Sequence, residues 1–212
     1  MSYSVQNRGQ GFILILSAPS GAGKSTLARH LVQTVAGVSL SVSTTTRSLR
    51  PGEVAGQSYH FVDQAAFRAR VERGDFLEWA EVFGHCYGTD LAHVDPVLAR
   101  GECVVLDIDW QGARQVRARR APEEVVSIAI LPPSRSVLQV RLSGRGSDDP
   151  QVIARRMAQA GEEISHWAEY DYLLINDDLT RARHELVAIV TAERLRRSRA
   201  GDAIQAILAT FA

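Results

Sequence analysis

Short, continuously apolar segments alternate along the chain with segments whose apolar residues recur at helical spacing. A strand-length segment that is apolar on successive residues is typical of a strand covered on both faces, as in parallel sheets. Such segments cover residues 12–16, 103–109, 125–131 and 172–175, with a weaker candidate at 40–43. Helical patterns between them cover residues 27–37, 111–120, 137–142, 150–167 and 178–197. The alternation predicts an α/β fold in which helices flank a parallel sheet, with ligands at the carboxyl ends of its strands.

A polar, glycine-punctuated stretch interrupts this alternation from about Thr44 to Leu98. Asp63 is a candidate N-cap of a helix within it, and Gly74 is the candidate residue that closes this helix. The elements that we predict here are strands at residues 59–62 and 76–83 and helices at residues 64–73 and 90–100. The stretch therefore indicates an insertion with its own small sheet.

The composition narrows the class of protein. The 212 residues suit one compact domain with a small insertion, and 24 basic residues balance 24 acidic residues. A neutral chain lacks the basic excess of a general nucleic-acid-binding surface. Cys86 and Cys103 form no C-x-x-C pair, and the apolar run at residues 12–16 is too short for a signal peptide or a membrane span. We expect a cytoplasmic protein without a nucleic-acid or membrane partner.

Lys24 is the only lysine, because the other 23 basic residues are arginines. It lies between a predicted strand and a predicted helix, in the segment APSGAGKS of residues 18–25. This segment matches the phosphate-binding pattern G-x-x-x-x-G-K-[ST], except that Ala18 replaces the first glycine. Glycines let backbone N–H groups approach phosphate, and the helix N-terminus adds a partial positive charge. We predict that Lys24 reaches the β- and γ-phosphates of a nucleotide and that Ser25 faces Mg²⁺; a turn that only joins strand and helix is the alternative.

The segment from Asp109 to Gly112 matches the D-x-x-G pattern that GTPases carry after a strand. GTPases also recognise guanine with N-K-x-D, which needs a second lysine, and the chain has none. We therefore interpret the match as coincidental.

Asp107 and Asp109 alternate at the end of a predicted strand, so both carboxylates should share the face toward the cleft. Solvated acids at a strand end are the alternative.

The region after the phosphate loop resembles the guanylate kinase family. The segments that carry the resemblance follow the family order from about residue 12 to residue 197, which is nearly the whole chain. They are residues 45–62 (TTRSLRPGEVAGQSYHFV), 76–81 (FLEWAE), 87–89 (YGT), 106–109 (LDID), 132–134 (PPS), 141–146 (RLSGRG) and 175–178 (INDD). The resemblance implies a bacterial enzyme that transfers phosphate from ATP to GMP with Mg²⁺.

The same resemblance implies a division of the chain and a set of site residues. The parts are a P-loop NTPase core (residues 1–43, 96–133 and 168–212), a GMP-binding insertion with a mixed sheet (44–95) and a lid segment (134–167). The residues implied for ATP and its phosphates are Ser20, Gly21, Ala22, Gly23, Lys24, Ser25, Thr26 and Asn176. Those implied for GMP are Ser43, Arg47, Arg50, Tyr59, Glu78, Tyr87, Thr89 and Asp109. The implied catalytic residues are Lys24, Arg47, Arg141, Arg145 and Arg156, and Mg²⁺ is expected at Ser25 through the phosphates, with Asp107 reaching it through a water.

The residue types suit these roles. The planar guanidinium groups of Arg47 and Arg50 match a dianionic phosphate. An ionised Glu78 only accepts hydrogen bonds, so it pairs with the N–H donors of guanine and leaves adenine mismatched. Phosphoryl transfer needs cations and in-line positioning more than a base. Two alternatives stay open: an interaction module that keeps the fold without catalysis, and a P-loop kinase for another phosphate acceptor. The sequence also leaves open whether copies of the chain associate.

Overall fold

A five-stranded parallel sheet forms the centre of the protein in a computed structural model that describes residues 9–82, 84–144 and 150–211. All four neighbouring pairs in this sheet run parallel. The strands, in spatial order, are β2 (Val38–Leu40), β7 (Cys103–Asp107), β1 (Phe12–Ser17), β8 (Val125–Leu131) and β9 (Tyr172–Ile175).

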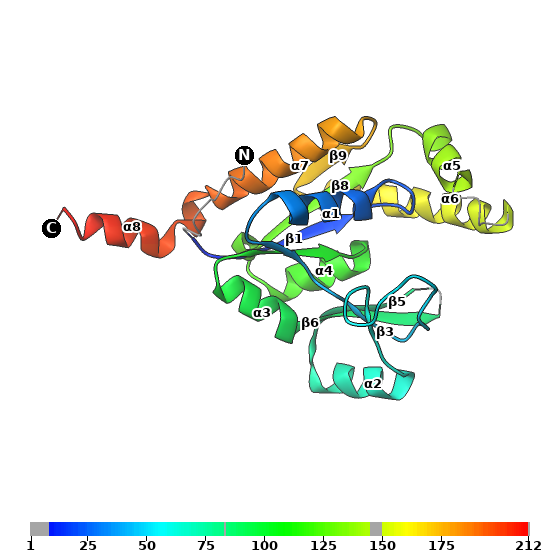
Figure 1. The fold of residues 1–212 in the computed structure, drawn as a ribbon, viewed down its shortest axis with the longest axis horizontal. Coiled ribbons are helices and arrows are strands. Elements are labelled where there is room, and N and C mark those ends of the chain that lie inside the picture. Colours follow the sequence, from blue (N-terminus) through cyan, green and yellow to red (C-terminus); the bar gives the residue numbers. More distant parts are fainter. Residues whose placement is uncertain (1–8, 83, 145–149, 212) are drawn as a thin grey trace.

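Helices cover both faces of this sheet (Figure 1). On one face lie α1 (Lys24–Thr34) and α7 (Leu179–Arg194), and on the other lie α3 (Leu91–Ala99) and α4 (Trp110–Arg119). Successive residues of β1 enter opposite clusters: Leu14 packs with the first pair of helices and Ile15 with the second. Both side chains are fully buried, which explains why the strand is apolar at every position.

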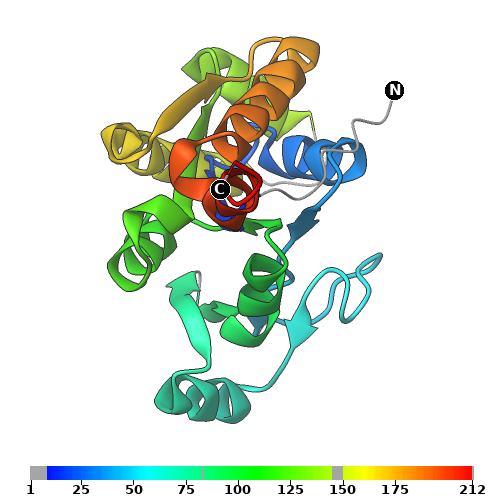
Figure 2. The same cartoon turned by 90° about the vertical axis from the view of Figure 1, so that its left-hand side faces the viewer.

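The insertion forms a separate lobe beneath this core (Figure 2). Its mixed sheet has the spatial order β4 (His60–Phe61), β3 (Thr44–Thr45), β6 (His85–Asp90) and β5 (Phe76–Val82). Helix α2 (Gln64–Arg73) covers it through Phe67, whose ring stacks on Phe76 with the ring centroids 4.7 Å apart.

The remaining elements lie at the two ends of the core in Figure 1. Helices α5 (Arg135–Ser143) and α6 (Pro150–Ser165) pack on one another at one end, and α8 (Gly201–Leu208) extends away from the other. Short 3-10 turns at Pro122–Glu124, Trp167–Glu169 and Arg197–Arg199 precede β8, β9 and α8.

The predicted α/β fold with a parallel sheet, flanking helices and a second, mixed sheet is confirmed. The predicted caps of α2 are also present: Asp63 accepts a hydrogen bond from the N–H of Ala66 at 2.7 Å, and Gly74 has a left-handed φ of 75°. The division into core, insertion and lid at residues 43/44, 95/96, 133/134 and 167/168 stays a prediction.

Two predicted strand boundaries were wrong. The strand expected at residues 40–43 lies at Val38–Leu40, and the strand expected to reach residue 109 ends at Asp107, because Asp109 caps α4. The sequence analysis also missed β6 and α8. Strand β6 is mostly polar, and its Gly88 leaves room for the Phe76 ring, which a Cβ would approach to 2.8 Å. Pairing with β3 and β5 forms this strand, and no local hydrophobic pattern reveals such pairing.

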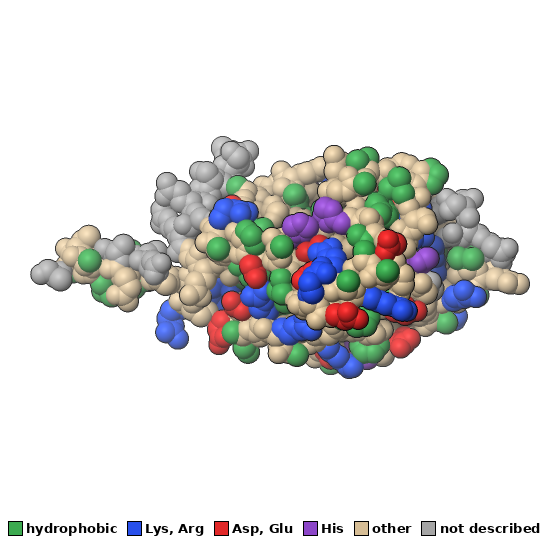
Figure 3. Space-filling model, turned by 90° about the horizontal axis from the view of Figure 1, so that it is seen from below, with side chains coloured by type: hydrophobic (Ala, Val, Ile, Leu, Met, Phe, Trp, Pro, Cys, Tyr) green, Lys and Arg blue, Asp and Glu red, His purple; other side chains and the backbone are tan. Residues whose placement is uncertain are grey.

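The lengths of the helices and the charges on the surface are relevant to membrane and nucleic-acid partners. In the part of the chain that the structure describes, no helix is both long and apolar enough to cross a membrane. The face seen from below carries arginine and acidic side chains intermixed over the same area (Figure 3). That face therefore presents no field of a single sign.

Candidate functional site

The phosphate loop, residues 18–23, turns between β1 and α1 in a conformation that requires glycine. Gly21 and Gly23 have φ values of 90° and 101°, which L side chains rarely adopt. A Cβ on Gly23 would also lie 2.2 Å from Nδ2 of Asn176. The loop is closed by a hydrogen bond from the N–H of Ala22 to the carbonyl of Pro19 at 3.0 Å. The predicted phosphate-binding segment thus has the tight backbone turn that its pattern requires.

The N-terminus of α1 is suited to an anion. It begins at Lys24, and among the described residues no side chain caps it and its first turn holds no acidic residue. The free N–H groups of a helix start carry about half an elementary charge. Ser25 and Thr26 are exposed beside it, and so is Ser20 in the loop. These positions agree with the predicted phosphate contacts, which stay predictions.

Lys24 forms an ion pair across the sheet edge with Asp107, at the end of β7, with Nζ and Oδ1 2.5 Å apart. Burial alone lowers the pKa of Lys24, but the charges of Asp107, Glu163 and Asp109 outweigh burial and raise this pKa above its ordinary value. Lys24 is therefore a fixed cation at neutral pH, held by a partner that a phosphate oxygen can replace.

Asn176 supports the phosphate loop from the end of β9. Its side-chain Nδ2 donates to the backbone carbonyl of Ala22 at 2.7 Å, and its backbone carbonyl accepts from Nη2 of Arg141 at 2.8 Å. Asn176 is buried, and the cap of α7 is a different residue, Asp178, which accepts from the N–H of Arg181. Nη1 of Arg141 is buried without a hydrogen-bond partner among the described residues, so it keeps a donor for an incoming oxygen.

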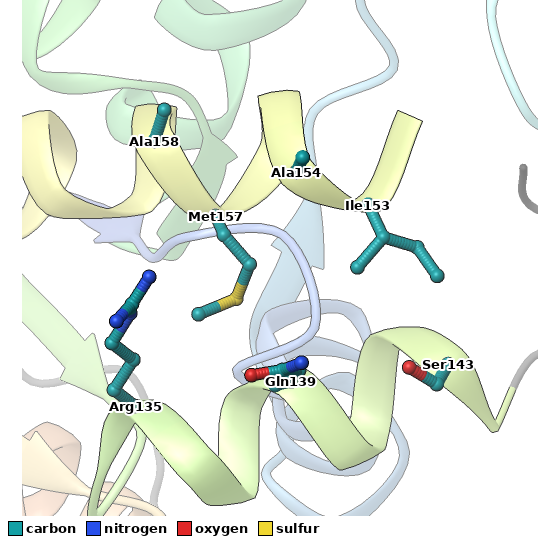
Figure 4. A pocket seen from close by; sticks show the side chains of 7 residues that line it. All are labelled: Arg135, Gln139, Ser143, Ile153, Ala154, Met157 and Ala158. Carbon is teal, nitrogen blue, oxygen red and sulfur yellow. The ribbon is translucent and has the colours of Figure 1, made fainter. Parts of the chain in front are cut away.

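The predicted lid residues are only partly placed. Arg156 is half-buried on α6, whereas Arg145 lies outside the described residues. A pocket of about 500 Å³ lies along the junction of α5 and α6, and Met157 projects into it toward Gln139 (Figure 4). None of the predicted site residues that the structure describes is among the residues that line this pocket, which are Arg135, Gln139, Ser143, Ile153, Ala154, Met157 and Ala158.

A buried carboxylate lies in the insertion at the predicted base site. Glu78 on β5 pairs in register with Thr89 on β6, and Oγ1 of Thr89 donates to Oε1 of Glu78 at 2.6 Å. Only 4% of Glu78 is exposed. Burial raises the pKa of Glu78 to about 7, with the Thr89 hydrogen bond opposing this rise and the charge of Asp109 adding to it. The structure thus brings Glu78, Thr89 and Asp109 together.

One predicted phosphate arginine of the insertion, Arg47, is held by an acid that the sequence analysis missed. Arg47 is buried and donates through Nη1 and Nη2 to the two carboxylate oxygens of Glu53 at 3.0 and 2.7 Å. Glu53 also accepts from the backbone N–H of Arg50, whose side chain is exposed. The guanidinium of Arg47 lies 5.2 Å from the ring centroid of Tyr59, and Tyr87 packs edge-on against Tyr59 at 5.9 Å.

The insertion and the phosphate loop face one another at the carboxyl ends of β1 and β7. Burial and then the charge of Asp107 raise the pKa of Tyr59, so this insertion residue lies close to the partner of Lys24. Asp109 likewise acts on both Lys24 and Glu78. Asp109 lies beyond the end of β7, so the two aspartates do not share a strand face, but the charges of both act on Lys24. Ser43 is half-buried at the entry to β3, where its carbonyl accepts from the N–H of His60 at 2.9 Å.

Glu163 on α6 is a further candidate that the sequence analysis missed. It is half-buried, and burial raises its pKa to about 7, with Lys24 opposing the rise and Asp109 adding to it. A glutamate within an amphipathic helix carries no local sequence signal that it will lie near the lysine of the phosphate loop. Only the position of α6 beside the phosphate loop reveals it.

A glycine loop at the carboxyl end of a parallel strand, a lysine at the start of the next helix and an acid on the neighbouring strand define a P-loop nucleotide-binding protein. Comparisons with known proteins specify the class further. The guanylate kinase family profile matches residues 10–193. The chain therefore belongs to the guanylate kinase family.

Individual relatives agree with this assignment. The chain is 56% identical over 189 residues to a guanylate kinase of Alkalilimnicola ehrlichii, covering 89% of this chain and 92% of that one. It is 54% identical over 190 residues to a guanylate kinase of Nitrobacter winogradskyi, covering 90% and 86%. Among solved structures, a guanylate kinase from Anaplasma phagocytophilum superimposes with a TM-score of 0.75 at 35% identity, covering 91% of this chain and 90% of that one.

The raised pKa of Glu78 predicts a pH-dependent loss of stability. The folded protein retains a proton on Glu78 that the unfolded chain loses near pH 4.5, so the free energy of unfolding falls as the pH rises from about 4.5 to about 7. Glu78→Gln removes this ionisation while keeping an acceptor for Thr89. The free energy of unfolding of the variant, measured relative to that of the wild type, should therefore rise by about 2 kcal/mol from pH 5 to pH 8.

Urea unfolding at both pH values measures this gain, with Glu81→Gln on the exposed side of β5 as the matched control. A difference between wild type and Glu78→Gln that is the same at pH 5 and pH 8 would contradict the raised pKa.

Proposed function

We propose that this protein transfers the γ-phosphoryl group of ATP to GMP, giving ADP and GDP, with the triphosphate on the phosphate loop and GMP in the insertion. The observation that carries this assignment is the pair of opposed groups: a buried acceptor at Glu78 and a fixed cation at Lys24, with Asp107 and Asp109 between them. Membership of the guanylate kinase family supports the same reaction.

The base is selected by hydrogen-bond complementarity. The Watson–Crick edge of guanine carries two N–H donors, which an ionised Glu78 can accept together. Adenine presents an acceptor at the corresponding ring nitrogen, which would leave the buried carboxylate unpaired. Thr89 holds one oxygen of Glu78, while Asp109 and Ser43 complete the proposed surroundings of the base. Binding the guanine donors replaces the proton that Glu78 otherwise retains near neutral pH.

The phosphate of GMP is bound by cations and hydroxyl groups of the insertion. Arg47 and Arg50 supply guanidinium groups, and Tyr59 and Tyr87 supply O–H donors. Arg47 is oriented in advance by its bidentate pair with Glu53 and by the Tyr59 ring. Because a guanidinium has five N–H donors, Arg47 can keep Glu53 and still donate to phosphate.

The residues around Ser25 fit Mg²⁺ that is held mainly by the nucleotide. Among the described residues, no three His, Cys, Asp or Glu side chains gather into a site that could hold a metal alone. The exposed Ser25 hydroxyl and the partly exposed Asp107 carboxylate offer the oxygen donors that Mg²⁺ prefers, the second through a water. When bound, the ion neutralises charge on the β- and γ-phosphate oxygens.

The chemistry then depends on positioning and charge. The attacking oxygen belongs to a GMP phosphate that is already anionic, so no side chain has to remove a proton. Lys24, Arg141, Arg145 and Arg156 supply the cations that stabilise the shared charge of the transition state. The unpaired donor of Arg141 and the replaceable partner of Lys24 support these two assignments. A fold-only interaction module has no need for these groups, which favours the enzyme over that alternative.

We also place the enzyme in the cytoplasm, with ATP and GMP as its partners and without a nucleic-acid or membrane partner. Cys86 and Cys103 are both buried, free thiols, as in proteins of reducing compartments. The mixed charges on the face in Figure 3 also disfavour a phosphate backbone there.

Substrate selection tests the proposed reaction. In a coupled assay with ATP and Mg²⁺, kcat/KM for GMP should exceed that for AMP, CMP and UMP on the order of 10³-fold or more, because none of these bases presents the two adjacent N–H donors that match the buried carboxylate. Equal turnover of the four nucleotides would show that Glu78 selects no base.

The phosphate loop is tested through its lysine. Lys24→Met should lower kcat by about 10²–10³-fold by removing a cation from the transferring phosphate. Arg29→Met, an exposed change on the same helix, is the matched control and should keep the wild-type rate. Thermal unfolding of both variants verifies the fold. A Lys24→Met enzyme within a few-fold of the wild type would rule out the role of Lys24.

A further inference from the structure

One face of α4 is hydrogen-bonded to the strand that carries Glu78. Gly112, Gln115 and Arg119 lie three and four residues apart and therefore share this face. Nε2 of Gln115 donates to the carbonyl of Trp79 at 2.7 Å, and its Oε1 accepts from the N–H of Trp79 at 3.1 Å. Nη1 of Arg119 donates to the carbonyl of Phe76 at 2.5 Å and to that of Leu77 at 3.1 Å. These four bonds bind the three residues that flank Glu78.

The position of β5 explains why these contacts matter. It is the last strand of its sheet and pairs with β6 alone. Its outer backbone groups would otherwise be unpaired, and the amide of Gln115 replaces a neighbouring strand at Trp79. The pairing of β5 with β6 is also irregular between Phe76 and Glu78. Such irregularities re-aim a side chain, and here Arg119 holds the backbone at that point.

Gly112 provides the space that the Glu78 carboxylate occupies. A Cβ at this position would lie 2.7 Å from Oε2 of Glu78. The N–H of Gly112 donates to Oδ1 of Asp109 at 2.9 Å, which completes the N-cap of α4. The D-x-x-G segment that resembled a GTPase motif therefore has a local meaning: its aspartate starts α4, and its glycine lets the carboxylate lie against the helix.

We propose that Gly112, Gln115 and Arg119 are positioning residues for guanine selection: α4 fixes the place of the Glu78 carboxylate by holding the backbone on both sides of it and by leaving space for it at Gly112. This inference rests on the proposed role of Glu78 in binding guanine. It makes selectivity a property of the junction between the core and the insertion. A residue of the core, 36 positions away from Trp79 in sequence, then controls recognition of the base.

A double-mutant cycle tests the proposal with GMP as the probe. Gln115→Ala should weaken GMP binding about tenfold in titration calorimetry, while KM for ATP and kcat stay within about twofold, because only the position of Glu78 changes. In the Glu78→Gln background the same change should cost less than about twofold, because the group being positioned is already lost. Gln111→Ala, the same change at an exposed residue one turn earlier on α4, is the matched control and should leave GMP binding unchanged.

Gly112→Ala separates positioning from stability. Alanine favours a helix over glycine, so the unfolding temperature should stay the same or rise, whereas the displaced carboxylate should weaken GMP binding. The preference for GMP over inosine monophosphate, which lacks the 2-amino donor, should also shrink. If the contact were merely structural, neither the affinity for GMP nor its preference over inosine monophosphate would change.

The outcomes are separable. If Gln115→Ala weakens GMP equally with and without Glu78→Gln, or weakens ATP and GMP together, α4 only docks the insertion and the inference is overturned. Unchanged selectivity in a folded Gly112→Ala enzyme would overturn it as well. If Glu78→Gln alone leaves GMP binding unchanged, the proposed base site itself is wrong, and the inference falls with it.

Discussion

The site is organised by carboxylates whose charges act on one ammonium group. Asp107, Asp109 and Glu163 all act on Lys24, and Asp109 also acts on Glu78. Burying several acids near a single cation is unfavourable, and the protein responds by raising the pKa of both Glu78 and Glu163 to about 7. The surroundings of Glu78 are therefore short of hydrogen-bond donors. The edge of a guanine base would supply them.

The phosphates and the base of a nucleotide are therefore expected in different parts of the site. In the proposed arrangement the phosphates bind at the start of α1 and at the arginines, where Nη1 of Arg141 has no hydrogen-bond partner among the described residues. In the same arrangement the base binds at Glu78, a buried acceptor that accepts from Thr89 through one of its two oxygens. Because Asp107 and Asp109 lie at the end of β7 and the start of α4, the same short segment separates these two regions. The reacting phosphates would thus meet between them, at the carboxyl edge of the parallel sheet.

Local physics explains which parts of this arrangement could be predicted from sequence. The phosphate loop depends on glycines next to an apolar strand, and α2 depends on a capping aspartate and a closing glycine, so a few adjacent residues suffice for each. Asp109 was misplaced because strand alternation was extended through it, although an aspartate three residues before a glycine N–H is also a helix-cap signal.

The other features depend on contacts between distant segments. Strand β6 exists because it pairs with β3 and β5, and Gln115 and Arg119 act on residues 36 to 43 positions earlier. Glu53 and Glu163 likewise resemble ordinary surface acids until the fold places them beside Arg47 and Lys24.

A crystal structure with GMP and a non-hydrolysable ATP analogue tests the central claim most directly. The account predicts guanine N–H groups on the Glu78 carboxylate and Nζ of Lys24 on a phosphate oxygen. A base bound away from Glu78, or a triphosphate that leaves Lys24 on Asp107 alone, would contradict it.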